Sequence, residues 1–179
     1  MNTIRLHDKQ FKPFIFQNQI NKAIDILAEQ MNKELKEEPL PLFLCVLNGA
    51  FMFTADLVRK MDFELELSFI KLSSYCGTQS TGEVSEIIGL NASVEGRTVV
   101  VIEDIVDTGI TIEKLVETLE KQHPKQIKIC TLLLKPDQYK KSLHLDYVGL
   151  KIPNAFIVGY GLDYNSYGRQ LPDIYVIEP

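Results

Sequence analysis

VVVIEDIVDTGIT, residues 99–111, is the stretch that decides the fold. Its first part, Val99 to Ile102, is an unbroken run of β-branched apolar residues, which is typical of a strand covered on both faces of a sheet. Glu103 and Asp104 place two carboxylates where such a strand ends. The stretch therefore predicts a buried strand with charged groups at its carboxyl end.

The turn that follows has the composition of an anion site. Asp107 to Thr111 combines a glycine, two threonine hydroxyls and exposed backbone N–H groups, and the apolar residues after it have the spacing of an amphipathic helix: Ile112, Leu115, Val116 and Leu119. A tight turn that leads into a helix N-terminus binds phosphate through its N–H groups and the helix dipole. Carboxylates beside such a turn indicate sugar hydroxyls, a metal ion, or both.

Length and composition predict one domain over residues 1–179. A chain of 179 residues can bury a full core, and 45% hydrophobic with 24% charged residues is ordinary for a soluble globular protein. The net charge of −5 argues against a nucleic-acid binder that depends on a basic surface. A small acidic enzyme that handles a metal-chelated substrate fits the composition better.

Cysteine usage favours the cytoplasm. Cys45 and Cys130 lie in apolar runs, which indicates buried thiols, whereas Cys76 lies in a polar loop that thiol reagents could reach. The spacing of the cysteines fits neither a disulfide framework nor a zinc site. No apolar signal segment begins the chain, and no run reaches membrane-spanning length. We expect a cytoplasmic protein with no membrane partner.

Apolar periodicity predicts alternating strands and helices. A first helix ends before Pro39, because apolar residues upstream repeat at helical spacing: Ile20, Ile24, Leu27, Met31 and Leu35. A second helix is predicted over 50–61, and strands are predicted over 42–47, 65–71 (edge or half-exposed), 126–134, 145–150 and 156–159. This order predicts an α/β fold with a mostly parallel central sheet flanked by helices, and ligands at the carboxyl ends of the strands.

Residues 73–86 break this order with a run of small, hydroxyl-rich residues. Gly77 and Gly82 are candidate hinges within the run. A loop of this length in a compact domain is usually functional or disordered, and the composition alone is compatible with either.

The 99–111 stretch resembles the phosphoribosyl-pyrophosphate motif of the type I phosphoribosyltransferases, in which four apolar and two acidic residues precede Asp-Thr-Gly-x-Thr. The alternative is a strand followed by an Asp-capped helix with surface acids, which the completeness of the match disfavours. Further blocks, in order from about Leu42 onward, are similar to the hypoxanthine-guanine phosphoribosyltransferase family: LNGAF at 47–51, KLSSY at 71–75, QSTG at 79–82, and FIVGYGLDYN at 156–165 with Arg169.

The resemblance implies the type I phosphoribosyltransferase fold, with a small hood built from the N- and C-terminal segments. It implies that the 5′-phosphate of phosphoribosyl pyrophosphate (PRPP) is bound by Asp107, Thr108, Gly109, Ile110 and Thr111. Glu103 and Asp104 match residues that bind the ribose 2′- and 3′-hydroxyls, directly or through Mg²⁺. Surface or salt-bridged carboxylates are the alternative for such a pair.

The resemblance also assigns the purine side of the site. Asp107 matches a proposed general base near purine N7, although Asp is also a favoured helix N-cap and both roles are compatible. Lys135 matches the lysine that donates to purine O6, and a solvated lysine is its alternative. Phe156 resembles the residue that stacks on the base, Ile157 offers backbone groups to the base edge, and Asp163 matches a contact to a second magnesium.

Two further groups face the pyrophosphate in the family. Arg169 matches a pyrophosphate-binding arginine, with a surface salt bridge as its alternative. Asn48 and Gly49 match a loop that often contains a non-proline cis peptide, and Asn48 stands where many relatives carry Lys or Arg, so backbone donation is the role expected of it. Ser74 and Tyr75 match the lid, over about 73–86, that closes on the reacting centre and excludes water.

The expected activity is transfer of the phosphoribosyl group of PRPP to hypoxanthine or guanine, giving IMP or GMP and pyrophosphate, with Mg²⁺ as cofactor and no nucleic-acid partner. The family implies a homodimer or homotetramer. Preference among hypoxanthine, guanine and xanthine depends on pocket geometry at Ile157 and Asp163. Two rival hypotheses are a nucleotide-sensing regulator that binds RNA or DNA, which the acidic charge disfavours, and a flavin- or nucleotide-binding module, which the missing glycine-rich patterns disfavour.

Overall fold

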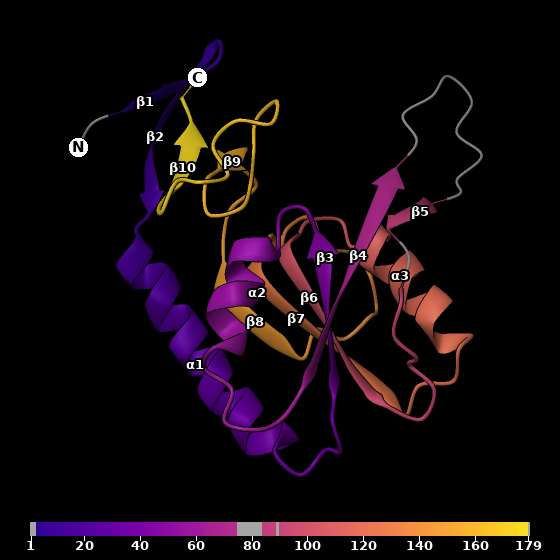
Figure 1. Cartoon of the computed structure of the whole chain (residues 1–179). Helices are drawn as coiled ribbons and strands as arrows, with labels where there is room; N and C mark the ends of the chain where they lie inside the picture. The colour runs from indigo at the N-terminus through magenta and orange to yellow at the C-terminus, as the bar shows by residue number, and fades with distance from the viewer. Residues whose placement is uncertain (1–2, 75–83, 89, 179) are drawn as a thin grey trace.

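A six-stranded sheet forms the centre of the protein (Figure 1). The computed structural model describes residues 3–74, 84–88 and 90–178. The strand order is β5-β4-β3-β6-β7-β8, and five of the strands are parallel: β3 (Leu42–Leu47), β4 (Glu66–Ser74), β6 (Thr98–Val106), β7 (Gln126–Leu134) and β8 (Tyr147–Lys151). β5 (Val84–Ile88) pairs antiparallel with β4. The predicted mostly parallel sheet is confirmed, with the 99–111 stretch in its central strand.

Helices cover both faces of this sheet (Figure 1). α1 (Gln17–Leu35) and α2 (Phe51–Val58) pack on one face, and α3 (Ile110–Glu120) packs on the other. The buried residues of α1 include all five apolar positions from which the helix was predicted. Among the described residues, no helix has both the length and the apolar character that crossing a membrane requires.

The two ends of the chain build a second, antiparallel sheet (Figure 1). Its strand order is β1-β2-β10-β9, from β1 (Ile4–Leu6), β2 (Lys9–Ile15), β10 (Ile174–Ile177) and β9 (Ile157–Val158). This sheet is the hood that the family resemblance implied. The strand expected over 156–159 forms as β9, but it belongs to the hood and not to the parallel sheet.

Three local expectations differ from the structure. α2 ends at Val58, before the predicted Met61, because the N–H groups of Lys60 and Met61 bond to carbonyls only three residues back. Strand β4 lies between β3 and β5, so of the two alternatives it is not an edge strand but a half-exposed one, with Leu67 and Phe69 exposed and Ile70 buried. The predicted 73–86 loop is shorter at both ends, since β4 runs to Ser74 and β5 starts at Val84, and their pairing satisfies backbone groups.

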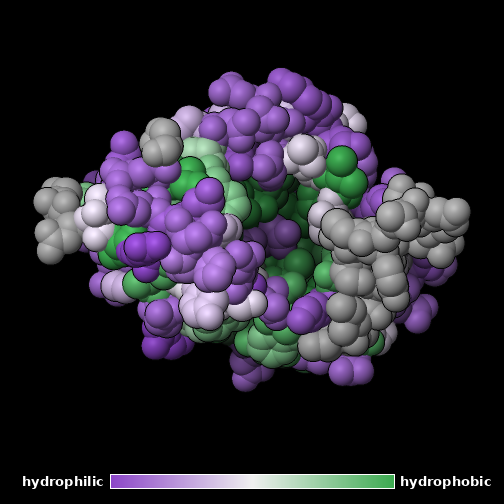
Figure 2. Space-filling model, turned by 90° about the horizontal axis from the view of Figure 1, so that it is seen from above, coloured by the Kyte–Doolittle hydropathy of each residue, from purple (hydrophilic) through white to green (hydrophobic). Residues whose placement is uncertain are grey.

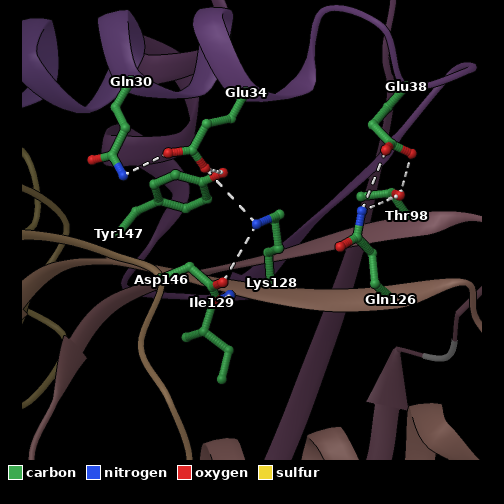
Figure 3. A network of polar contacts seen from close by, with 9 residues as sticks. All are labelled: Gln30, Glu34, Glu38, Thr98, Gln126, Lys128, Ile129, Asp146 and Tyr147. Carbon is green, nitrogen blue, oxygen red and sulfur yellow. Dashed lines mark hydrogen bonds and ion pairs between the residues drawn. The ribbon is translucent and has the colours of Figure 1, made fainter.

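The amino ends of the central strands are tied to α1 and to the turn after it by polar contacts (Figure 3). Glu38 accepts hydrogen bonds from Thr98 Oγ1 at 2.6 Å and from Lys125 Nζ at 2.8 Å. Glu34 accepts from Gln30 Nε2 at 3.0 Å and from the buried Tyr147 hydroxyl at 2.8 Å. Every carboxylate of this network therefore has charged or hydroxyl partners.

Candidate active site

The turn after β6 forms a small pocket at the carboxyl end of the sheet. Gly109 has φ +82°, and α3 begins immediately after it at Ile110. The pocket has a volume of about 90 Å³ and is lined by residues 105–112 and Glu103. Its size and its position at a helix N-terminus suit one phosphate group. The structure thus brings the five predicted phosphate-binding residues, 107–111, around a single hollow.

A second pocket, of about 370 Å³, adjoins the first. Figure 2 looks down on the molecule from above and shows a hollow with apolar and polar residues at its bottom. The lining comes from the loop after β3, the end of β6, the end of β7 and the hood: Gly49, Asp104, Ile105, Asp107, Lys135, Ala155, Phe156, Ile157, Leu162, Asp163 and Arg169. Asp107 lines both pockets, so it lies at their junction.

The acidic pair is divided between the two pockets. Successive residues of a strand point to opposite faces, and Glu103 lines the small pocket while Asp104 lines the large one. Burial and the nearby Asp104 raise the pKa of Glu103 well above its usual value, and burial raises the pKa of Asp104 to about 6. No described residue donates a hydrogen bond to the buried Glu103 Oε2. Such an unsatisfied oxygen is suited to a ligand that brings donors or a cation.

Asp107 and Lys135 form an ion pair, with 2.7 Å between Asp107 Oδ2 and Lys135 Nζ. Lys135 is 8% exposed, so its ammonium is directed into the site and is not the solvated lysine of the alternative hypothesis. Asn154 Oδ1 lies 3.4 Å from the same ammonium and was not predicted, because a single Asn before a hood strand carries no distinctive signal. The two side chains for which the sequence predicted proton handling and recognition of the base therefore lie in direct contact.

Arg169 and Asp163 are also joined, at 2.6 Å between Arg169 Nη2 and Asp163 Oδ1. Arg169 Nη1 donates to the carbonyl of Gly161 at 2.7 Å. A β-carbon on Gly161 would come within 2.0 Å of the Gly49 carbonyl oxygen, so the hood backbone packs directly on the loop after β3. The Leu47–Asn48 peptide of that loop is cis, as the resemblance implied. Gly49 lines the large pocket, whereas Asn48 is exposed.

Phe156 presents a half-exposed ring to the large pocket. Two aromatic rings pack against the Phe156 ring: Tyr164 is edge-on to it at 5.8 Å between centroids, and the Phe11 centroid lies at 6.4 Å. Tyr164 in turn donates to Asp8 Oδ1 at 2.7 Å. Phe11 lies in β2 and Tyr164 in the segment between β9 and β10, and neither was predicted as a site residue, because an isolated aromatic residue is most often core.

Other predicted residues complete the comparison. Ile157 is buried in β9 and lines the large pocket. Ser74 ends β4, so the backbone of this predicted lid residue pairs with Val84. Tyr75 and Cys76 lie outside the described residues, and the predictions made for them stay predictions.

The carboxylates offer a place for a hard cation. Glu103, Asp104 and Asp163 supply oxygen ligands of the kind that Mg²⁺ prefers, and the charge of Asp163 acts on Asp104. Within residues 3–74, 84–88 and 90–178, no three His, Cys, Asp or Glu side chains converge to hold a metal by themselves. Mg²⁺ commonly binds through one or two carboxylates together with water and substrate phosphates, so these residues fit a metal that arrives with a phosphorylated ligand.

A larger groove of about 530 Å³ lies at the opposite, amino end of the sheet, between α3 and β7. Of its charged lining residues, Lys125 and Asp146 are already engaged with Glu38 and Lys128, and Glu120 is exposed on α3. We place the active site at the carboxyl end, because there the charged groups converge on open space and parallel α/β sheets bind ligands at that end.

Comparison with known proteins agrees with this geometry. Residues 16–165 match the model of the phosphoribosyl transferase domain. Hypoxanthine-guanine phosphoribosyltransferase of Bacillus subtilis (strain 168) is 44% identical over 174 residues, which cover 97% of this chain and 96% of that protein. A crystal structure of a hypoxanthine phosphoribosyltransferase from Staphylococcus aureus superposes with a TM-score of 0.87 at 38% identity, covering 94% of this chain and 91% of that one.

A third relative is the Trypanosoma cruzi hypoxanthine phosphoribosyl transferase, whose structure was studied for the role of its C-terminal region in oligomeric state and enzymatic activity. It has a TM-score of 0.87 at 34% identity and covers 98% of this chain and 95% of that one. The chain therefore belongs to the phosphoribosyltransferase family, and within it to the hypoxanthine-guanine phosphoribosyltransferases.

Proposed function

We propose that the protein transfers the phosphoribosyl group of PRPP to N9 of hypoxanthine or guanine, producing IMP or GMP and pyrophosphate. One observation carries this proposal: a phosphate-sized pocket and a larger, partly aromatic pocket adjoin, and Asp107 lies at their junction. A nucleoside 5′-monophosphate has the same division into a phosphate and a base, joined by a sugar. The sugar would span the junction, beside the carboxylates of Glu103 and Asp104.

The phosphate end follows from backbone chemistry. The turn over residues 107–111 presents N–H groups at the start of α3, and the helix dipole favours an anion there. The exposed Thr108 and Thr111 supply hydroxyls to the same anion. Ile110 adds no charge, so its contribution is its backbone N–H.

The purine end follows from the side chains of the large pocket. The Lys135 ammonium donates to a 6-oxo group, which disfavours a 6-amino purine because two sets of donors would then face each other. The Phe156 ring stacks on the base, and the backbone of Ile157 meets the base edge. Asp107 accepts the N7 proton as N9 attacks C1 of the ribose, since its carboxylate lies at the junction where the base and the sugar meet.

The remaining groups serve the leaving pyrophosphate. Arg169 has the planar donors that suit phosphate oxygens, and its ion pair with Asp163 orients it in the ligand-free site. The backbone N–H of Gly49 and of Asn48 would donate beside it. Mg²⁺, held through Glu103, Asp104 and Asp163 together with the substrate, would neutralise charge on the departing group.

The direct test mixes the protein with PRPP, Mg²⁺ and each purine in turn and measures pyrophosphate release. We expect release with hypoxanthine and with guanine, and none with adenine. A panel that includes xanthine ranks the 6-oxopurines. Absence of release with both hypoxanthine and guanine would overturn the assignment.

We also propose that the protein acts in the cytoplasm as a homodimer or homotetramer. The free thiols of Cys45 and Cys130 are buried, which suits a reducing compartment. Phe51 on α2, together with Leu67 and Phe69 on one face of β4, exposes apolar rings and side chains that self-association would cover. Light scattering coupled to size-exclusion chromatography tests the assembly, and a monomer at micromolar concentration would contradict it.

A further inference from the structure

The segment that follows β7 runs alongside the turn over residues 107–111, here called the phosphate turn. Residues 135–141, here called the strap, touch residues 107–113 at three successive places: Lys135 with Asp107, Tyr139 with Gly109, and Lys141 with Glu113. The two outer contacts are ion pairs of 2.7 Å and 2.6 Å, and both join residues 28 positions apart in sequence. The strap therefore begins at the purine-reading lysine and ends beside the first turn of α3.

The middle contact depends on glycine at position 109. A β-carbon there would come within 2.5 Å of Tyr139 Cε2 and 3.0 Å of Lys141 Cγ, so the strap side chains lie directly against the backbone of the phosphate turn. The Tyr139 hydroxyl donates to the carbonyl of Leu143, which holds the ring from its far end. The ring thus supports the turn from outside the pocket.

The outer contacts fix the ends of the strap. The Lys141 ammonium pairs with Glu113 in the first turn of α3, where a bound phosphate would lie nearby, and both side chains are about one-third exposed. At the other end, the carbonyl of Lys135 accepts hydrogen bonds from the N–H groups of Gln138 and Tyr139, both at 3.1 Å. A tight turn therefore connects Lys135 to Tyr139, and one cannot move far without the other.

We propose that Tyr139 and Lys141 are positioning residues that hold the phosphate turn against the strap, so that the geometry of the phosphate site and the position of Lys135 change together. Neither residue lines the two pockets, and their effect passes through Gly109, α3 and Lys135. This inference rests on the proposed function, because it assumes that PRPP occupies the turn and a purine meets Lys135. Filling the turn with the 5′-phosphate would then set the ammonium for the base.

The experiment compares Tyr139→Leu and Lys141→Met with conservative partners by steady-state kinetics, varying PRPP and hypoxanthine separately. We expect Tyr139→Leu to raise both KM values about tenfold, because a displaced support misplaces both sites. Tyr139→Phe keeps the ring against Gly109 and loses only the hydrogen bond to Leu143, so it is expected to stay within about twofold. Lys141→Met is expected to raise both KM values about two- to fivefold, and Lys141→Arg to restore them. Lys60→Met is the matched control, since it breaks a 2.7 Å surface pair with Asp25 on the helical layer.

Thermal unfolding of each variant separates support from simple packing. Lower melting temperatures for Tyr139→Leu and Lys141→Met with both KM values equal to those of Lys60→Met would overturn the proposal, and so would a rise in only one KM for Tyr139→Leu. If Tyr139→Leu does not fold, the KM values of Lys141→Met and their restoration by Lys141→Arg decide the question. Turnover by the wild-type protein tests the proposed function separately. Calorimetric titration of PRPP into the wild type and the variants measures PRPP affinity without turnover, and so tests the effect of the strap on the phosphate site by itself.

Discussion

The two ends of the central sheet hold carboxylates in opposite states. At the amino end, Glu38 and Glu34 are bound by hydroxyl, amide and ammonium donors, and these hydrogen bonds lower the pKa of both (Figure 3). At the carboxyl end, Glu103 and Asp104 are partly buried, one oxygen of Glu103 has no described partner, and loss of solvent raises both pKa values although the Ile105 N–H donates to Asp104 Oδ1 at 2.9 Å. The same chemical group thus stabilises the fold at one end and strains it at the other.

The contrast distinguishes carboxylates with a structural role from those with a functional role by their hydrogen-bond partners alone, with no comparison to related proteins. A charge that the fold satisfies needs no ligand, whereas buried carboxylates that the fold leaves short of donors destabilise the free protein until a ligand supplies them. Proteins retain such arrangements where activity requires them, at the expense of stability. This contrast supports the proposed active site at the carboxyl end, although the larger groove lies at the other end.

The largest expected effect is that of Asp107→Asn on turnover. The amide can still accept the hydrogen bond of Lys135, so PRPP and purine should bind with KM values within a few-fold of wild type. It cannot take the N7 proton, and we expect kcat to fall about 10²- to 10³-fold. Initial-rate kinetics measure both parameters, and a variant with wild-type kcat would rule out the base role.

Gly161→Ala and Gly96→Ala compare the two ends of the sheet by their effect on the free energy of unfolding. At the carboxyl end, Gly161 has φ +99°, and a β-carbon would come 2.0 Å from the Gly49 carbonyl, so we expect a loss of about 3 kcal/mol in the free energy of unfolding together with weaker PRPP binding. Gly96→Ala at the amino end is the matched control. Gly96 has φ +68° with nothing near its missing β-carbon, so backbone strain alone, about 1 kcal/mol, is expected there.

Urea denaturation of the two glycine variants measures both losses. Equal losses would mean that the close approach of hood and loop adds nothing, and that the carboxyl end is no more tightly packed than the amino end.

The sequence revealed much of the carboxyl end, because its signals are local. The apolar run of β6, the Asp107–Thr111 turn and the apolar spacing of α3 lie in one continuous stretch, and the structure places them as predicted. The pattern also led to the acidic pair, since its position at the end of a buried strand is visible in the chain.

The rest depends on contacts between distant residues. Nothing in the sequence around Tyr139 indicates that its ring meets Gly109, because only the fold brings β7 beside β6. The amino-end network was not anticipated for the same reason: Glu38 and Thr98 are 60 positions apart. The strand over 156–159 was placed correctly along the chain, but its sheet is set by pairing with β10, which no periodicity encodes.

Asp104→Asn should raise the free energy of unfolding, whereas most substitutions lower it. Burial raises the pKa of Asp104 to about 6 from 3.8, so the free protein loses stability as the pH rises through this range and the carboxylate ionises. The neutral amide avoids this loss. In chelator, we expect the variant to be about 1–2 kcal/mol more stable than wild type at pH 7, equal to it near pH 4, and much less active.

Melting curves at both pH values check the sign for Asp104→Asn. A variant less stable than wild type at pH 7 would show that the carboxylate is already satisfied in the free protein, and the contrast between the two ends would fail there.

Glu38→Gln gives the smallest effect and tests the satisfied end. Hydrogen bonds from Lys125 and Thr98 lower the pKa of Glu38 below its usual 4.5, so its contribution to stability is complete above about pH 5 and disappears as the pH falls through the lowered value. We expect the variant to lose about 1 kcal/mol at pH 7, to differ little from wild type at pH 3, and to keep full turnover. Glu29→Gln, on the exposed face of α1, controls for the loss of one charge. If Glu38→Gln lowered turnover as strongly as Asp104→Asn does, the assignment of a structural role to the amino end and a functional role to the carboxyl end would be wrong, because the amino end would then also act on the reaction.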